Sequence, residues 1–186
     1  VEEKGIIHLR IRAKGEAAHA ARPWLGSNAL HDLSLGLIRV QEWFDSFIPD
    51  DLHPDQNETH WFPTCALTML STPNDSPNRI PAEAGAVLDI RFVPPETSAT
   101  ILEQISSLLG SGFEVEPIVA AEPTHLAPDK EFLEVIGEVT GEEARLVRAC
   151  GGSDGRFFCA HDIPVLLSRP RVGNLHGRDE WIEVES

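Results

Sequence analysis

Hydrophobic and polar side chains alternate along residues 5–13, with apolar residues at positions 7, 9, 11 and 13. A period of two is typical of a strand with one buried face. Residues 23–47 instead carry an apolar side chain at every third or fourth position, which predicts a long amphipathic helix. The same patterns predict strands over residues 61–70, 84–93 and 113–119, and a second helix over residues 97–109.

The order strand, helix, strand, strand, helix, strand predicts a ferredoxin-like β-α-β-β-α-β domain of the α+β class over residues 1–120. The pattern changes after this domain. It predicts a helix over residues 129–139, a strand over 144–148, a helix through Phe157 and Phe158, and a strand over 164–167. Alternating helices and strands normally build a parallel sheet, but these few elements cannot complete one. Residues 121–186 are therefore predicted to be a partial α/β segment of a larger domain.

Composition narrows the classes of function. The 186 residues contain 15 Lys and Arg against 30 Asp and Glu, a net charge of −15, and 41% of them are hydrophobic. So acidic a chain repels nucleic acids and anionic membrane surfaces, and its apolar runs are too short to span a bilayer. The three cysteines lack the spacing of a disulfide framework, which favours reduced thiols and a cytoplasmic protein.

Two parts of the first domain carry side chains suited to chemistry. His19 is surrounded by small residues, so a ligand can approach its imidazole, although a turn histidine taken alone is more often a solvated surface group. Asn78 closes a polar loop, and the next strand places Asp89 and Arg91 on one face. Arg91 can bind a carboxylate through two hydrogen bonds, whereas composition alone favours a salt bridge on a solvated sheet face.

Two segments of the second part are glycine-rich. Gly152 and Ser153 lie in a turn between a predicted strand and a predicted helix, where backbone amides can bind an anion. A helix N-cap at Ser153 or Asp154 explains the same residues. His176 follows the last predicted strand, the place where α/β proteins bind ligands. It is a candidate metal ligand supported by a nearby carboxylate, and equally a loop histidine.

These candidates fall in four segments: GEAAHAARPWLGSNAL, NRIPAEAGAVLDIRF, GGSDGRFF and GNLHGRDEWIEVES. In order and spacing they resemble the dinuclear zinc amidohydrolases, the family of succinyl-diaminopimelate desuccinylase, acetylornithine deacetylase, aminoacylases and glutamate-releasing carboxypeptidases. The segments WFPTCALT and GGSDGRFF are most similar to the desuccinylase branch. That branch usually has an extra Thr before the Ser, so the deacetylase branch stays open.

The resemblance implies a role for each part of the chain. Residues 1–120 would be the lid or dimerisation domain, and residues 121–186 the C-terminal segment of a catalytic domain whose other zinc ligands match nothing in this sequence. The implied roles are oxyanion stabilisation in the opposite subunit for His19, substrate binding for Asn78, Arg91, Gly152 and Ser153, and zinc ligation for His176.

The sequence therefore predicts part of a cytoplasmic, homodimeric hydrolase that cleaves the amide bond of an N-acyl amino acid or peptide-like substrate. In the intact enzyme two zinc ions would activate the attacking water, and a Glu would transfer the proton. The fragment itself would be inactive and would hold zinc incompletely or not at all. The alternative is a dimerising ferredoxin-like module that binds a partner without catalysis.

Overall fold

The structure is a computed structural model of the 186-residue chain. It describes residues 2–50, 52, 60–125, 129–141, 143, 146–165, 167, 171–175 and 177–184. The chain divides into two compact units, one of residues 1–125 and 146–153 and the other of residues 126–145 and 154–186. Each unit is described by itself below.

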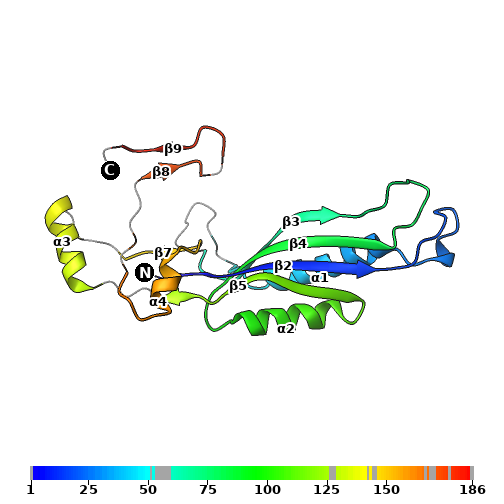
Figure 1. The fold of residues 1–186 in the computed structure, drawn as a ribbon, viewed down its shortest axis with the longest axis horizontal. Helices are drawn as coiled ribbons and strands as arrows, with labels where there is room; N and C mark the ends of the chain where they lie inside the picture. The colour runs from blue at the N-terminus through cyan, green and yellow to red at the C-terminus, as the bar shows by residue number, and fades with distance from the viewer. Residues whose placement is uncertain are drawn as a thin grey trace. The chain divides into compact units, whose positions relative to one another are not determined.

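The first unit is built on a four-stranded antiparallel sheet (Figure 1). Across the sheet the strands follow the order β3-β4-β2-β5. The two central strands, β2 and β4, pair over ten residues from Gly5↔Phe92 to Lys14↔Glu83. One helix follows β2 and another follows β4. The elements are β2 (Gly5–Lys14), α1 (Ala29–Asp45), β3 (Thr64–Ser71), β4 (Glu83–Phe92), α2 (Ser98–Leu109) and β5 (Phe113–Ala121).

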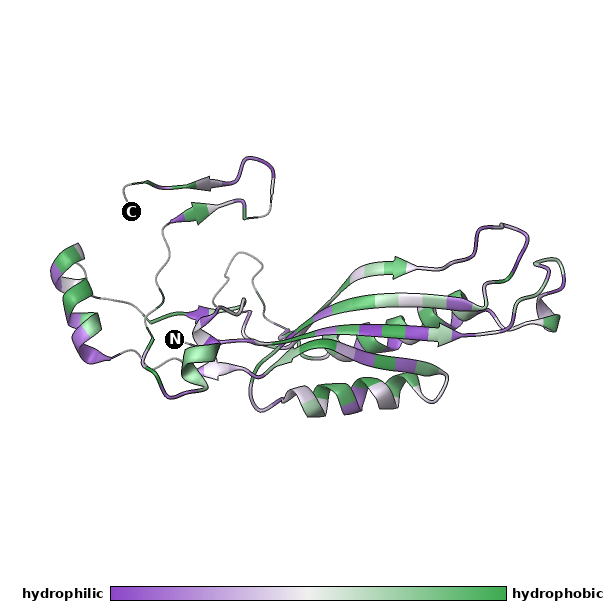
Figure 2. Cartoon of the chain, viewed as in Figure 1, coloured by the Kyte–Doolittle hydropathy of each residue, from purple (hydrophilic) through white to green (hydrophobic). Residues whose placement is uncertain are grey.

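The hydrophobic core lies between one face of this sheet and the two helices. Successive side chains of a strand point to opposite faces, and Figure 2 shows the resulting alternation of apolar and polar residues along β2. Ile7, Leu9 and Ile11 are fully buried, while the residues between them face away from the helices. Both helices pack against the same apolar residues, so they cover the same face. Leu33, Val40 and Phe44 come from α1, and Ile101, Ile105 and Leu109 come from α2.

The long helix predicted from residue 23 is interrupted in the structure. Pro23–Leu25 form a single 3-10 turn, η1, and α1 begins only at Ala29. The reason is the side chain of Asn28, whose Oδ1 accepts hydrogen bonds from the amides of Leu30 and His31 at 3.1 and 3.2 Å. Asparagine in this N-cap position satisfies helix donors that lack a carbonyl partner, which fixes the start of the helix.

A small three-stranded sheet lies where the chain enters and leaves the four-stranded sheet. β1 (Glu2–Glu3) pairs antiparallel with β6 (Thr124–His125) and parallel with β7 (Arg148–Ala149). Arg148 Nε donates to Glu2 Oε2 at 2.6 Å, which ties β7 to β1. Of the strand predicted over residues 144–148, only Arg148 is in a strand, and residues 144 and 145 lie outside the described residues.

The second unit contains the helix α3 (Lys130–Thr140), the short helix α4 (Gly155–Cys159), and a hairpin of β8 (Val172–Gly173) and β9 (Trp181–Ile182). α3 and α4 confirm the helices predicted over residues 129–139 and through Phe157 and Phe158. The strand predicted over residues 164–167 is wrong, because residues 164, 165 and 167 are not in a strand and residue 166 is outside the described part. No described strand pairs with this run, and an apolar run needs a partner to become a strand. Within the described residues, no helix combines the length and the apolar character needed to cross a membrane.

Candidate functional site

One end of the four-stranded sheet carries a tip, formed by residues 15–28 and 72–82. Glu16 and Ser27 exchange two backbone hydrogen bonds, at 2.8 and 2.9 Å. The two segments are joined by the amide of Ala20, which donates to the carbonyl oxygen of Asn78 at 2.7 Å, and by the amide of Ile80, which donates to the carbonyl oxygen of Ala18 at 2.8 Å. The structure therefore brings together two residues singled out in the sequence, His19 and Asn78, although they are far apart along the chain.

The hydrogen bonding of His19 determines which ring nitrogen carries the proton. Its Nδ1 accepts from the backbone amide of Ala21 at 3.1 Å. A backbone N–H can only donate, so Nδ1 must be an acceptor, and the neutral imidazole then carries its proton on Nε2. The side chain is exposed at the tip. His19 is thus a fixed Nε2–H donor available to a group outside this chain.

Asn78 is oriented in a similar way. Its Oδ1 accepts from the hydroxyl of Ser76 at 2.6 Å, while its backbone carbonyl is the acceptor for Ala20. Because the oxygen of the side-chain amide has this local partner, the group that Asn78 can offer to a ligand is the Nδ2 donor pair. Both predicted residues of the tip therefore present donors.

Arg91 lies toward the other end of β4 and already has a carboxylate partner. Its Nε and Nη2 donate to the two oxygens of Asp89 at 2.7 and 3.0 Å. His8 on β2 contacts the same carboxylate, with Nε2 3.1 Å from Oδ2. Burial raises the pKa of Asp89, but the hydrogen bonds and charges of Arg91 and His8 outweigh burial, so the pKa is lowered overall. Arg91 thus forms the salt bridge with Asp89 that the sequence offered as the alternative to binding a substrate carboxylate.

The glycine-rich turn lies at this same end, against the small sheet. The amide of Ser153 donates to Glu3 Oε2 at 3.3 Å, and Glu3 is only 3% exposed. Asp154 stands at the N-cap of α4, but its side chain makes no capping hydrogen bond. The neighbouring Lys4 is also buried and donates to the carbonyl oxygen of Phe62 at 2.8 Å. Burial lowers the pKa of Lys4, Cys150 raises it, and Arg91 lowers it further.

Sequence analysis did not identify Glu3, the residue that contacts the turn. Two glutamates and a lysine before an apolar strand look the same whether the chain enters a sheet through solvent or through a buried crossing. The signal that would have found Glu3 is the pairing of β1 with β7, which joins residues about 145 positions apart in the sequence. Such a pairing cannot be read from local pattern.

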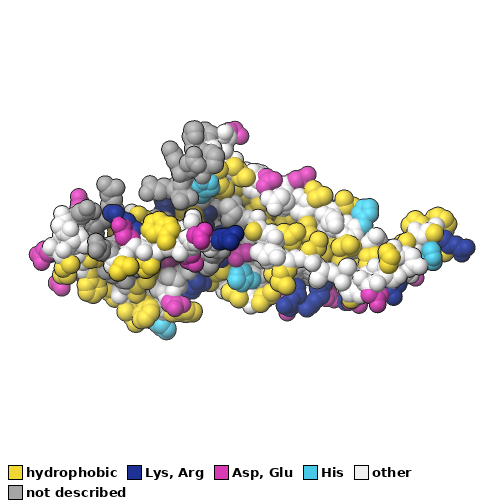
Figure 3. All heavy atoms as spheres, turned by 90° about the horizontal axis from the view of Figure 1, so that it is seen from above, with side chains coloured by type: hydrophobic (Ala, Val, Ile, Leu, Met, Phe, Trp, Pro, Cys, Tyr) yellow, Lys and Arg dark blue, Asp and Glu magenta, His cyan; other side chains and the backbone are white. Residues whose placement is uncertain are grey.

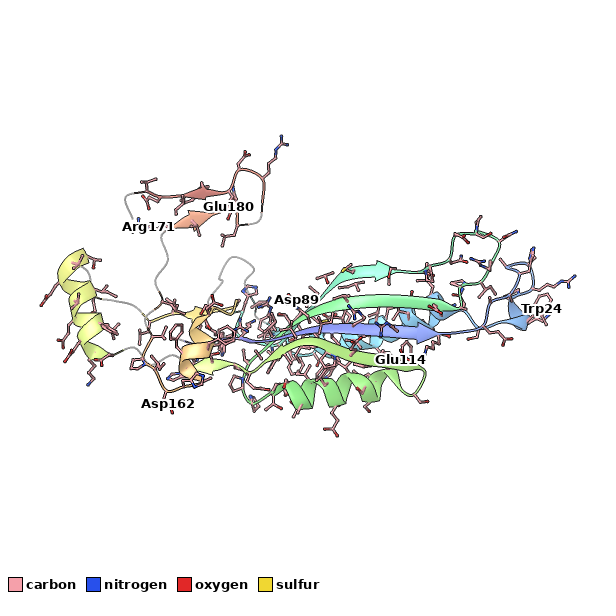
Figure 4. All side chains as sticks on the ribbon, in the orientation of Figure 1. Trp24, Asp89, Glu114, Asp162, Arg171 and Glu180 are labelled. Carbon is pink, nitrogen blue, oxygen red and sulfur yellow. The ribbon has the colours of Figure 1, made fainter. Side chains whose placement is uncertain are left out.

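The predicted residues therefore form two groups at opposite ends of one sheet. His19 and Asn78 lie at the tip, whereas Arg91, Gly152 and Ser153 lie at what we call the base. Arg91 lies eight positions along β4 from Glu83 at the tip end, a span of roughly 26 Å at the rise of an antiparallel strand. Figure 4 shows this separation through its labels, with Trp24 at the tip and Asp89 toward the base.

A groove of about 410 Å³ crosses the face of the sheet that the helices leave open. Among the predicted site residues that the structure describes, none lines this groove. Its three cationic residues already pair with glutamates on β5: Arg10 and Arg12 with Glu116, and Lys14 with Glu114. The groove is therefore separate from both groups of candidate residues.

His176 lies outside the described residues, so the structure does not place it. Among the residues that the structure does describe, no three or more His, Cys, Asp or Glu side chains gather where they could hold a metal ion. A zinc site requires three or four such ligands. The described residues of this chain therefore do not form a zinc site by themselves.

Comparison with known proteins identifies the family of this chain. The family described as "Peptidase dimerisation domain" matches residues 1–116. The chain belongs to this family. The matched residues include β2, β3, β4, α1 and α2.

Several curated relatives of this chain are named succinyl-diaminopimelate desuccinylase. The protein from Acidiphilium cryptum is 30% identical over 200 residues, covering 99% of this chain and 49% of the relative. The protein from Thioalkalivibrio sulfidiphilus is 25% identical over 192 residues, covering 98% and 48%. The chain therefore spans about half the length of the curated relatives that it matches.

Solved structures share the fold. A tripeptidase from Staphylococcus aureus matches with a TM-score of 0.74 and 16% identity, over 97% of this chain and 47% of that one. An aminopeptidase from Bacillus cereus matches with a TM-score of 0.70 and 19% identity, over 100% and 48%. At these identities the likeness concerns the fold alone.

Proposed function

We propose that this chain is part of a zinc-dependent amidohydrolase that cleaves the amide bond of an N-acyl amino acid or peptide-like substrate, as in the desuccinylase branch. Residues 1–120 would be the lid and dimerisation domain, and residues 121–186 the C-terminal segment of the catalytic domain. The family match and the curated relatives, which align with nearly all of this chain but with half of their own length, support this assignment.

We also assign the first unit to the ferredoxin-like arrangement. The support is the strand order β3-β4-β2-β5 with antiparallel pairing throughout, together with two helices that share one apolar face. The mixed sheet of β1, β6 and β7 then marks the crossing between lid and catalytic domain.

One observation carries the proposal: the candidate residues lie in two groups roughly 26 Å apart along β4. A substrate the size of an acylated amino acid cannot touch both groups of one copy. Two copies related by a two-fold axis can resolve this, because the tip of one copy can meet the base of the other. Each site would then contain His19 and Asn78 from one copy and Arg91, Gly152 and Ser153 from its partner.

The outer surface of β3 and α1 suits such a pairing. β3 has no charged residue and no proline, and it exposes Leu67, Met69 and Leu70, while α1 exposes Leu35 and Ile38. Figure 3, which views the molecule from the β3 side of Figure 1, shows hydrophobic side chains along this surface. An uncharged edge strand is a template for pairing with another chain. The opposite edge, β5, is protected by Glu114, Glu116 and Pro117.

The chemistry assigned to this chain is positioning and charge stabilisation. His19 donates its Nε2–H to the oxygen that becomes negative when the amide carbonyl is attacked, and a single donor of this kind contributes about 3 kcal/mol to the transition state. Asn78, Arg91 and the amides of Gly152 and Ser153 hold the substrate and its carboxylate. Bound zinc would supply the activated water, with His176 as one of its ligands.

A reducing, cytoplasmic location is part of the proposal. Its support is the cysteine chemistry: Cys65, Cys150 and Cys159 all lie in the described part of the chain and form no disulfide. Burial, the largest effect, together with Asp89 and Asp45, raises the pKa of Cys65 to about 12. Its thiol therefore stays protonated and unreactive at neutral pH.

A mixing experiment with the complete enzyme tests the composite site. His19→Ala removes a tip residue and Arg91→Gln a base residue, and we expect each homodimer to lose turnover by about 100-fold or more. A mixed dimer has one site in which both residues are intact. Random exchange of equal amounts should therefore restore about a quarter of the wild-type activity.

The control mixes two tip variants, His19→Ala and Asn78→Ala. No site in that mixed dimer receives an intact tip, so activity should stay at the level of the parents. If the mixture of tip and base variants also stays at that level, the composite site is wrong. If the wild-type enzyme hydrolyses no N-acyl amino acid at all, the non-catalytic interaction module is the better assignment.

A further inference from the structure

Trp24 and Leu25 are large apolar side chains that stand out at the tip. They are 75% and 60% exposed, and Figure 4 places Trp24 at the far end of the first unit. The preceding residues of this loop have small side chains: His19 is flanked on both sides by pairs of alanines, at positions 17–18 and 20–21. Adjacent exposed apolar residues that include a tryptophan are a candidate contact site, because tryptophan is enriched among strong interface contacts.

The backbone fixes these side chains relative to His19. The amide of Arg22 donates to the carbonyl oxygen of His19 at 2.8 Å, and the amide of Leu25 donates to that of Arg22 at 3.1 Å. Gly26 then packs so closely that an added Cβ would meet the carbonyl oxygen of Glu16 at 2.5 Å. Two consecutive hydrogen-bonded turns and the close packing at Gly26 hold this loop in one conformation. The positions of Trp24 and Leu25 are therefore fixed relative to His19.

We propose that Trp24 and Leu25 form an apolar anchor that packs against the protein surface of the partner protomer beside the site that His19 enters. The inference rests on the proposed composite site, which brings the tip to the partner. Charge also fits: the anchor lies beside the exposed Arg22, and the partner, a copy of this chain, has a net charge of −15.

The geometry favours a protein surface over the substrate as the occupant. Successive residues of a 3-10 turn point about 120° apart, so Trp24 and Leu25 cover different directions and together span more surface than one small acyl group. A polar acyl amino acid also offers little apolar area to an indole. A second copy of the chain supplies a broad surface, and tryptophan is the residue most enriched among strong interface contacts.

Photo-crosslinking in the complete enzyme tests the contact directly. With Trp24 replaced by the photoreactive analogue benzoylphenylalanine, irradiation should give a covalent dimer. The matched control carries the same analogue at Ile118, which is 46% exposed on β5, the edge strand opposite β3. A yield of covalent dimer at position 24 no higher than at position 118 would overturn the anchor.

Kinetics separate a failure of the anchor from a failure of the composite site. Trp24→Ala should lower kcat/KM about tenfold or more, and Trp24→Phe should recover most of this loss. Mixed with Arg91→Gln, the Trp24→Ala protein should regain activity; mixed with His19→Ala, it should not. If His19→Ala complements Arg91→Gln while Trp24→Ala behaves like wild type, the composite site stands and the anchor is wrong.

Discussion

Asp89 shows how one ionised side chain organises the base. Its carboxylate binds Arg91 through two hydrogen bonds and also contacts His8 on the neighbouring strand. The sequence showed that Asp89 and Arg91 share a face, because they are two residues apart on a strand. It did not show the part of His8, which depends on the register of β2 against β4. A substrate carboxylate at Arg91 would have to share this cation with Asp89.

The lowered pKa of Asp89 links its ion pair to pH. Because the folded-state pKa lies below the unfolded value of about 3.9, the stabilisation is fully present above that value and is lost as pH falls through the folded pKa. Asp89→Asn should therefore lower the free energy of unfolding at pH 7 by about 1–2 kcal/mol. The difference from wild type should shrink at pH 2–3 in urea denaturation followed by circular dichroism.

Glu114 provides the control for this measurement. Its pKa is also lowered, mainly by its hydrogen bond with Lys14, but both side chains of the pair are exposed. Exposed ion pairs contribute little to stability, so Glu114→Gln should unfold at the same urea concentration as wild type. An equal loss of stability in both variants would mean that burial of the Asp89 pair has no influence.

At the scale of helices and strands, the period of the hydrophobic residues predicted the elements of the first unit well. The first strand, predicted over residues 5–13, is β2, and the second helix, predicted over 97–109, is α2 with Thr97 as its cap. The start of α1 was wrong because apolar spacing continues through Pro23–Leu25 although Asn28 caps the helix. The second unit was predicted less well, since its strands have only two residues each and carry almost no periodicity.

The cap at Asn28 can be tested by substitution. Asn28→Ala removes the acceptor for the amides of Leu30 and His31, and we expect the free energy of unfolding to fall by about 1 kcal/mol. Ser34→Ala is a matched change one turn later, where the hydroxyl only donates to the carbonyl oxygen of Leu30. Thermal or urea unfolding that showed the same loss for both variants would contradict the capping role.

On the scale of the whole molecule, the ordered motifs predicted a set of candidate residues, and the family resemblance implied that His19 acts in the opposite subunit. Linear order places His19, Asn78 and Arg91 in one domain and hides the fact that β4 runs between the last two. Only the folded sheet shows that the tip and the base face opposite ends. The homodimer was already implied by the resemblance, and this distance adds support for a site divided between two copies, because no local sequence signal reports a separation along a strand.

The proposed dimer surface predicts a change in assembly. Leu70→Lys places a charge on the exposed edge strand β3, where lysine opposes strand pairing, and we expect dimers to dissociate in sedimentation velocity at micromolar concentrations. Ile118→Lys makes the same change on β5 and should leave the dimer intact. Dissociation by the β5 variant alone would assign the interface to the opposite edge.

The small sheet of β1, β6 and β7 has a consequence for how such proteins arise. Glu2 pairs with His125 and Glu3 pairs with Thr124, so the polypeptide enters and leaves the four-stranded sheet on neighbouring strands about 5 Å apart. A domain whose two ends adjoin can be inserted into a host chain, or deleted from it, without stretching either. The geometry at Glu2 and Glu3 thus allows this sheet and its helices to be inserted into a host chain, or removed from it, as one unit.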